Sequence, residues 1–361
     1  MKPIDFLQRQ KSLQQIIQEQ EIDMIIIPPS VNFFYMFKGY LSISERLICG
    51  VIDKTEDSFL VAPSFEKENM QIQTTFDDVV TWNEDENPYE ILKDQVTYEP
   101  KKIAIESSTP FDIYSRLKEQ FSSSEFVNGK TILNQLRMVK NDAEIERMVK
   151  AAEHTSEGII KTLESVKVGQ NELEILRLAQ EQMTKLSGEM SWALVQIDEN
   201  SAVPHGKPST KKLKQDSVIL IDAGTSCDHY FADITVTSVY GKASDEFKNI
   251  YSIVEEANNS ALNKSKEGIP AEEVDFAARE IIEQAGYGKY FTHRLGHGLG
   301  LEVHEEPYIV KGNRTPLVSG NVHTDEPGIY IPGKFGIRIE DDILVREKSK
   351  RLVEFDRYLW Q

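Results

Sequence analysis

The stretch that decides the fold runs from Val218 to Thr235 and reads VILIDAGTSCDHYFADIT. An apolar run, a polar turn and a second apolar run are typical of a β-hairpin. Asp222 and Asp233 lie at equal sequence distances from the midpoint between Cys227 and Asp228. A hairpin whose turn is centred on that midpoint would make the two carboxylates cross-strand neighbours on one face. Such a pair beside an apolar strand is unfavourable unless one group is protonated or a cation lies between them. The alternative is that both aspartates face solvent independently.

A second hairpin is predicted from Thr324 to Asp342, in the sequence TDEPGIYIPGKFGIRIEDD. Its turn falls at Pro332-Gly333, and Glu326 and Glu340 are equidistant from residue 333. Four carboxylates facing one apolar pocket would carry a charge of about −4, which two divalent cations would neutralise. The two hairpins together therefore predict a dinuclear metal site.

The histidines are concentrated in the second half of the chain, where residues 205–323 hold six of the seven. The glycine-rich segment 292–307, THRLGHGLGLEVHEEP, contains three of them, and its glycines allow the backbone to approach a ligand closely. His297 is the predicted metal ligand, and His304 suits a hydrogen-bonding or proton-transfer role at a polarised carbonyl. His154, His229 and His323 are predicted to be structural.

In order and spacing, these residues match the pattern of the pita-bread metallopeptidases. The chain resembles the Xaa-Pro peptidases, prolidase and aminopeptidase P, over nearly its whole length. The resemblance implies that two metals are bridged by two carboxylates, with one carboxylate serving one metal and an imidazole and a carboxylate serving the other. The bridging ligands would be Asp233 and Glu340, and the others Asp222, then His297 and Glu326.

The same resemblance implies substrate-facing roles for His205, His293, His304 and Arg338. His304 would stabilise the tetrahedral intermediate, and Glu326 would relay a proton to the proline nitrogen.

The sequence departs from the family pattern in two places. Asp198 stands near a position where the family usually has glycine, which affects the loop that carries His205. Tyr308 stands where prolidases of this layout often carry an arginine that holds the substrate carboxylate. Arg314 is the candidate replacement. Without an arginine at position 308, we predict similar kcat/KM values for dipeptides and tripeptides.

The chain is predicted to form two domains. Strand-like runs alternate with helical patterns through about residue 128, which indicates an α/β domain. Asn141 and Glu144 resemble a capping box that opens a second domain of helices packed on an antiparallel sheet. The predicted bounds are 1–128 for an N-terminal α/β creatinase-like domain, 129–140 for a linker, and 141–361 for an α+β pita-bread catalytic domain.

Composition limits the partners and the compartment. The 361 residues carry a net charge of −18, which argues against nucleic acid as a partner. No apolar run is long enough to span a membrane, and the N-terminus lacks the pattern of a secretory signal. Cys49 and Cys227 are far apart and suggest no disulfide framework. We therefore expect a cytoplasmic protein with no membrane partner, and the resemblance implies a homodimer.

The predicted activity is hydrolysis of the peptide bond before proline, which releases the N-terminal residue from Xaa-Pro dipeptides or short peptides. The oxygen-rich ligand set favours Mn²⁺, with Co²⁺ or Zn²⁺ as alternatives. Methionine aminopeptidase-like activity would use the same ligands, but the N-terminal domain argues against it. A metal-free creatinase-like hydrolase or a non-catalytic pita-bread binding module should have lost ligands that this chain retains.

Overall fold

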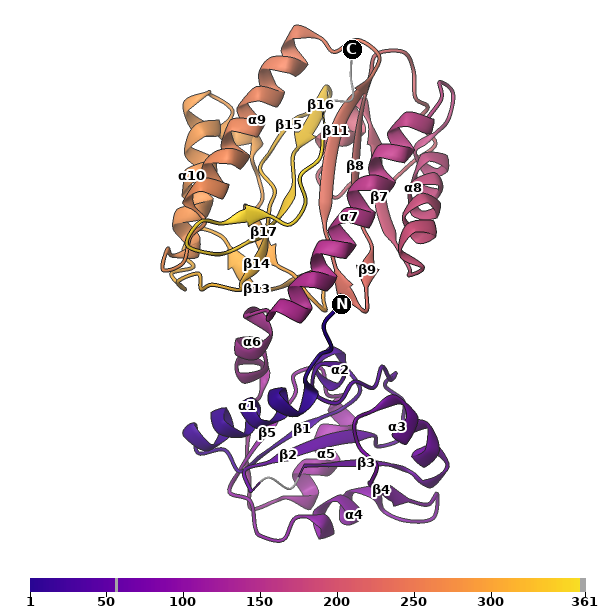
Figure 1. Cartoon of the computed structure of the whole chain (residues 1–361), viewed down its shortest axis with the longest axis vertical. Helices are drawn as coiled ribbons and strands as arrows, with labels where there is room; N and C mark the ends of the chain where they lie inside the picture. Colours follow the sequence, from indigo (N-terminus) through magenta and orange to yellow (C-terminus); the bar gives the residue numbers. More distant parts are fainter. Residues whose placement is uncertain (56–57, 358–361) are drawn as a thin grey trace. The chain divides into compact units, whose positions relative to one another are not determined.

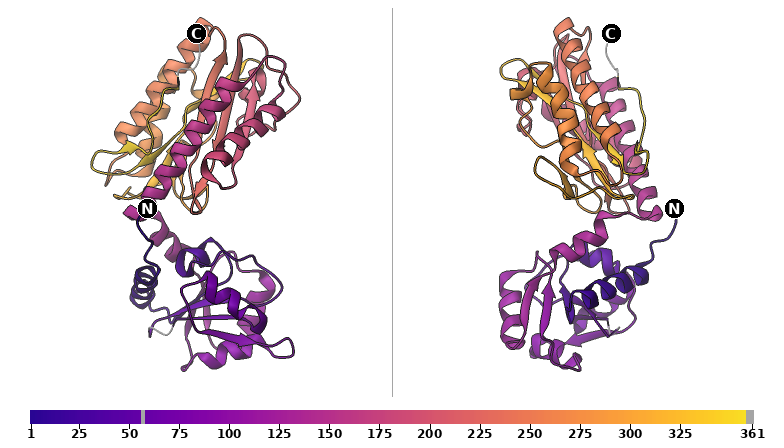
Figure 2. Two further views of the ribbon diagram at one scale, coloured as in Figure 1. Left: turned by 45° about the vertical axis from the view of Figure 1, so that its right-hand side comes forward. Right: turned by 90° about the vertical axis from the view of Figure 1, so that its left-hand side faces the viewer.

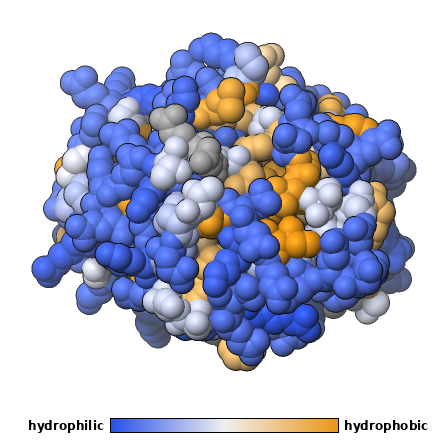
Figure 3. Space-filling model, turned by 90° about the horizontal axis from the view of Figure 1, so that it is seen from below, coloured by the Kyte–Doolittle hydropathy of each residue, from blue (hydrophilic) through white to orange (hydrophobic). Residues whose placement is uncertain are grey.

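The computed structural model describes residues 1–55 and 58–357. The chain forms two compact units, Pro3–Arg137 and a larger one made of Met1–Lys2 with Met138–Gln361. Within the described residues, no helix is both long enough and apolar enough to cross a membrane. Figure 3 shows a face covered mostly by hydrophilic residues, with a smaller hydrophobic region.

The smaller unit is a mixed β-sheet with helices on both faces (Figures 1 and 2). Its central strand β1 (Met24–Ile27) is buried along its whole length, as an apolar strand covered on both sides must be. The strand order is β4 (Val79–Trp82), β3 (Phe59–Pro63), β2 (Cys49–Asp53), β1, β5 (Lys102–Ile105) and β6 (Glu125–Asn128). The helices are α1 (Phe6–Glu19), α2 (Val31–Phe37), α3 (Lys67–Gln73), α4 (Pro88–Gln95) and α5 (Phe111–Gln120), and α6 (Lys130–Met138) follows the last strand.

The larger unit places helix pairs around antiparallel sheets, which confirms the expected pita-bread architecture. One sheet has the order β11 (Ile234–Tyr240), β8 (Ser217–Gly224), β7 (Trp192–Ile197). Another has the order β13 (Glu305–Ile309), β12 (Gly296–Gly298), β14 (Val322–Asp325), β17 (Asp341–Leu344), β18 (Lys350–Arg351). Two short hairpins pair β9 (Ser226–Cys227) with β10 (Tyr230–Phe231) and β15 (Gly328–Ile331) with β16 (Phe335–Arg338). The helices are α7 (Asp142–Ser165), α8 (Glu172–Ser187), α9 (Asp245–Lys264) and α10 (Ala271–Gln284).

The helix start signal read from the sequence is confirmed, because Asn141 and Glu144 form a complete capping box at the start of α7. Asn171 and Glu174 form a second capping box at the start of α8. The expected linker contains α6, and the boundary between the units falls along the chain between Arg137 and Met138. The domain bounds themselves stay a prediction.

The register predicted for the first hairpin is wrong by two residues, because the turn is centred one residue later than predicted. Asp222 pairs with Thr235, and the turn lies at Asp228-His229. These two residues have φ angles of 47° and 69°, and positive φ at both central positions is the requirement of a type I′ hairpin turn. Asp233 therefore lies in the irregular stretch between β10 and β11 and does not face Asp222 directly.

The register predicted for the second hairpin is confirmed. Gly328 pairs with Arg338 and Ile331 with Phe335, which centres the hairpin on Gly333. The strand-like segment from residue 336 to 345 is split into β16 and β17, and Glu340 lies at the break. There its backbone N–H donates to the carbonyl of Thr235 at 3.2 Å, which joins the second hairpin to the first.

Candidate metal centre

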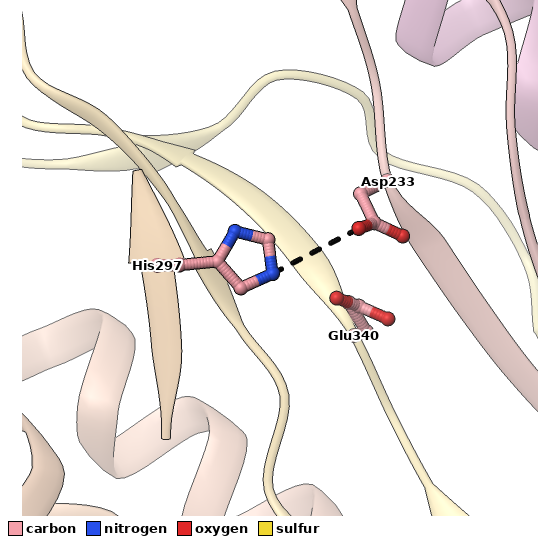
Figure 4. A group of neighbouring side chains, drawn as sticks. All are labelled: Asp233, His297 and Glu340. Atoms are coloured by element: carbon pink, nitrogen blue, oxygen red, sulfur yellow. Dashed lines mark ion pairs between the residues drawn. The ribbon is translucent and has the colours of Figure 1, made fainter. Parts of the chain in front are cut away.

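Three buried side chains converge on one point between the sheets (Figure 4). Asp233, His297 and Glu340 each offer one ligand atom, and these atoms all lie within 4.8 Å of one another. His297 comes from β12, and each carboxylate comes from one of the hairpins. The His297 Nε2 atom is 3.9 Å from Asp233 Oδ2 and 3.4 Å from Glu326 Oε1, so Glu326 adjoins the same group.

A cavity of about 540 Å³ opens at this cluster. Its lining brings together every site residue predicted from the sequence. These are Asp222, Asp233, His297, Glu326 and Glu340 as ligands, with His205, His293, His304 and Arg338 around them. Trp192, Leu194 and Arg294 also line the cavity and were not predicted.

Glycines on both sides of His297 allow the strands to pack this closely. A Cβ atom at Gly296 would lie 2.0 Å from the carbonyl oxygen of Thr324, and one at Gly298 would lie 2.2 Å from that of Glu306. Neither neighbour is a flexible side-chain end, so any larger residue would push the backbones apart. The imidazole of His297 therefore depends on its flanking glycines for its position.

Hydrogen bonds fix the tautomer of His297. Its Nδ1 lies 3.1 Å from the carbonyl oxygen of Gly298, which can only accept, so Nδ1 carries the proton. Burial, with the nearby His304, lowers the pKa of His297 to about 3, so the ring is neutral. The lone pair of Nε2 is thus directed toward the carboxylates, as a metal ligand requires.

The carboxylates are buried close to one another. Burial and the neighbouring Glu340 and Asp222 raise the pKa of Asp233 well above its usual value. Burial and the charge of Glu326 do the same to the pKa of Glu340, and burial raises the pKa of Glu326 to about 7. Among the described residues, no group donates a hydrogen bond to Oδ1 of Asp222 or of Asp233, although both atoms are buried. Oxygen atoms of this kind, beside an imidazole lone pair, fit divalent cations.

Arg338 balances the charge of one carboxylate and links the two hairpins. Its guanidinium donates to Asp222 Oδ2 at 2.6 Å, to Thr235 Oγ1 at 2.9 Å and to Tyr330 Oη at 3.1 Å. The Thr235 hydroxyl in turn donates to Glu340 Oε2 at 2.5 Å. Asp222 therefore accepts a direct hydrogen bond from the guanidinium, whereas the contact of Arg338 Nε with Glu340 Oε2 is longer, at 3.7 Å.

Comparison with known proteins agrees with this geometry. The model of metallopeptidase family M24 matches residues 146–347, and that of the creatinase/prolidase N-terminal domain matches residues 9–139. The chain belongs to metallopeptidase family M24. The resemblance seen in the sequence is thereby confirmed, and membership implies divalent metal ions.

Several known proteins are similar to this chain over nearly its whole length. The Xaa-Pro dipeptidase of Pyrococcus furiosus is 35% identical over 356 residues, which cover 98% of this chain and 99% of that protein. The prolidase structure from Thermococcus sibiricus has a TM-score of 0.91 at 34% identity and covers 99% of this chain and 100% of that one. The X-Pro aminopeptidase of Thermotoga maritima has a TM-score of 0.85 at 33% identity and covers 97% of this chain and 99% of that one.

Tyr330 is a residue of this M24 site that sequence reasoning missed. His293 Nδ1 lies 2.7 Å from the carbonyl oxygen of Arg294, so it carries the ring proton, and Nε2 accepts from the Tyr330 hydroxyl at 2.8 Å. Both nitrogens of His293 are thus engaged by the protein. The sequence did hold a signal for Tyr330. Residues two apart on a strand share a face, and Tyr330 is two residues from Gly328, which pairs with Arg338 across the hairpin.

His304 differs from His293 in its surroundings. It is exposed, its ring centroid lies 4.2 Å from that of His297, and no hydrogen bond engages its nitrogens within the described part of the chain. Burial of the ring face, with Arg294 and His205 nearby, lowers its pKa. A neutral imidazole with free nitrogens is thus available at the cavity.

His154, His229 and His323 do not line the cavity. His323 is buried, its Nδ1 donates to the carbonyl oxygen of Thr324 at 2.8 Å, and its Nε2 is 2.6 Å from Ser265 Oγ. His229 lies in the first hairpin turn, and His154 lies on α7.

The loop that carries His205 keeps a glycine-like conformation at Asp198. Its φ angle is 50°, in the left-handed region, and its carboxylate accepts from Val218 N at 2.9 Å and Ser217 Oγ at 3.0 Å. Buried Glu172 joins the two ends of the loop, because it accepts from Ile197 N at 2.7 Å and from Ser209 N at 2.6 Å. Side-chain hydrogen bonds therefore hold both ends of the loop.

Proposed function

We propose that this M24 enzyme hydrolyses the peptide bond before proline in Xaa-Pro dipeptides and short Xaa-Pro peptides. The observation that carries the proposal is the convergence of the predicted ligands and substrate-facing histidines on one cavity. End-to-end similarity to an Xaa-Pro dipeptidase supports the substrate class.

The site would hold two divalent cations. Asp233 and Glu340 would bridge them, Asp222 would bind one, and His297 and Glu326 would bind the other. Mn²⁺ is the first candidate because carboxylate oxygens dominate the ligand set, and Co²⁺ and Zn²⁺ are the alternatives. Bound cations would lower the pKa of the attacking water and polarise the scissile carbonyl.

The surrounding side chains would orient the substrate and move protons. His304, with its nitrogens free at the cavity, would donate a hydrogen bond to the developing oxyanion. Glu326 would deliver a proton to the leaving proline nitrogen. His205 and His293 would contact the substrate. Because both of its nitrogens are engaged, His293 would contribute a ring surface held in place by Tyr330.

We further propose a homodimer in the cytoplasm. Both cysteines are free thiols, which suits a reducing compartment. The dimer is expected from the family alone, and sedimentation equilibrium would measure it directly.

A reconstitution assay tests the proposed function. Chelator-treated protein should be inactive toward Leu-Pro and Leu-Pro-Gly and should recover on addition of Mn²⁺, Co²⁺ or Zn²⁺. Cleavage of Met-Ala but not of Xaa-Pro peptides would instead support methionine aminopeptidase-like activity. Metal binding without hydrolysis of any peptide would support a binding module.

A further inference from the structure

Two arginines line the cavity, and the structure uses them differently. Arg338 is buried and paired with Asp222 at 2.6 Å. Arg294 is half-buried, and within residues 1–55 and 58–357 its guanidinium has no carboxylate partner and donates no hydrogen bond. An arginine at a cavity with its donors unused is available to an anionic part of a ligand.

The aromatic ring of Tyr308 positions this guanidinium. The Arg294 guanidinium carbon lies 4.5 Å from the ring centroid, and the two residues are brought together by the pairing of β12 with β13. Stacking occupies one face of the planar group and leaves its N–H edges free for a bidentate contact. Tyr308 thus stacks against an arginine that lies just before the neighbouring strand β12.

We infer that Arg294 binds the C-terminal carboxylate of the substrate and makes the site selective for dipeptides. The identity of the scissile bond in this inference rests on the proposed function. A dipeptide carries an anionic carboxylate directly after its second residue, whereas a tripeptide has a neutral amide there. Because the protein carries a net charge of −18, an unpaired arginine is needed locally to attract an anion.

Arg314 does not provide this contact. Its side chain is 87% exposed, its Nε lies 3.3 Å from Glu272 Oε1, and it does not line the cavity. The presence of Tyr308 predicts similar kcat/KM values for dipeptides and tripeptides when no other arginine binds the carboxylate. If Arg294 binds it, the enzyme should prefer dipeptides.

The test compares substrates that differ only at the C-terminus. The Mn²⁺-loaded enzyme is assayed with Leu-Pro, Leu-Pro-amide and Leu-Pro-Gly, and with Leu-Ala and Leu-Ala-amide. We expect kcat/KM to favour the free dipeptide over its amide by about tenfold to a hundredfold, the range for a charge-assisted contact. Arg294→Gln should remove this preference, mainly by raising KM for the dipeptide, and should lower kcat/KM for the amide by a smaller factor than for the dipeptide. Arg294→Lys should retain part of it.

Arg314→Gln is the matched control and should leave the preference intact. Equal losses on dipeptide and amide in Arg294→Gln, or no preference in the unmodified enzyme, would overturn the inference. If Leu-Ala is cleaved with a carboxylate preference and Leu-Pro is not, the proposed function fails and the role of Arg294 stands. If no peptide is cleaved, calorimetric titration with Leu-Pro and its amide measures the preference as affinity, and equal affinities would overturn the inference.

Discussion

The two hairpins that supply the carboxylates hold them in different ways. In the first, Asp222 lies within β8 and is paired with Arg338, whereas Asp233 lies outside the strands. In the second, Glu326 and Glu340 both lie just beyond the strand ends, and threonine hydroxyls donate to them. The carboxylate on the regular strand accepts a hydrogen bond from the Arg338 guanidinium at 2.6 Å, whereas Glu340 lies 3.7 Å from the same group. We therefore expect the carboxylates outside the strands to depend more on a bound cation than Asp222 does.

The largest expected effect is the loss of a bridging carboxylate. Asp233→Asn or Glu340→Gln should lower kcat at least about 10³-fold and reduce metal content, measured by atomic emission. In metal-free protein, the same changes should raise the melting temperature, because they remove a charge whose burial is unfavourable. Retained activity would refute the dinuclear site, and a lower metal-free melting temperature would refute the contrast with Asp222.

The next largest effect on kcat should come from His304, which lies outside both hairpins. His304→Ala should lower kcat about 10² to 10⁴-fold with metal content unchanged, because a free imidazole at the cavity would be lost. His229→Ala, in the first hairpin turn, and His323→Ala, bonded to Ser265, should change kcat little. Loss of metal from the His304 variant would show that it is a ligand.

Removal of Arg338 should leave the negative charge of Asp222 without the guanidinium that neutralises it. Arg338→Met leaves Asp222, whose side chain is 13% exposed, without its partner, and breaking a largely buried pair costs about 3 to 5 kcal/mol. Urea unfolding of the metal-free protein measures this loss, and added Mn²⁺ should restore part of it. The control Arg314→Gln, at an exposed pair, should change the free energy of unfolding by less than about 1 kcal/mol.

The sequence predicts which acidic and histidine residues converge at the cavity better than it predicts the residues around them. The centre of the second hairpin was readable because Pro332-Gly333 marks a turn. The first was misplaced because Asp228 and His229 adopt left-handed conformations that adjacent residues of similar polarity could also have adopted. Tyr330 and Arg294 were missed because their roles arise from packing between strands distant in sequence.

The base of the first hairpin should depend on both the conformation and the side chain of Asp198. Asp198→Ala loses the bonds to Val218 and Ser217 and places Ala at a φ of 50°, which together should cost about 2 to 3 kcal/mol. Asp198→Gly loses only the bonds and should cost about 1 kcal/mol. KM should rise in both variants because the loop carries His205. Equal destabilisation by the two changes would show that backbone strain has no part.

The smallest effect should come from the turn of the second hairpin. Gly333 has a φ of 73°, and a Cβ atom there would meet no atom of the described structure within 4 Å. Gly333→Ala should therefore cost only the strain of the left-handed conformation, about 1 to 2 kcal/mol, measured by urea unfolding. Gly333→Asn is the control and should cost less, because asparagine adopts this conformation more readily. Activity should fall less than about tenfold in both, because the pairing of Gly328 with Arg338 fixes the register from the other end of the hairpin. A loss of metal in the alanine variant alone would show instead that the turn controls the separation of Glu326 and Glu340.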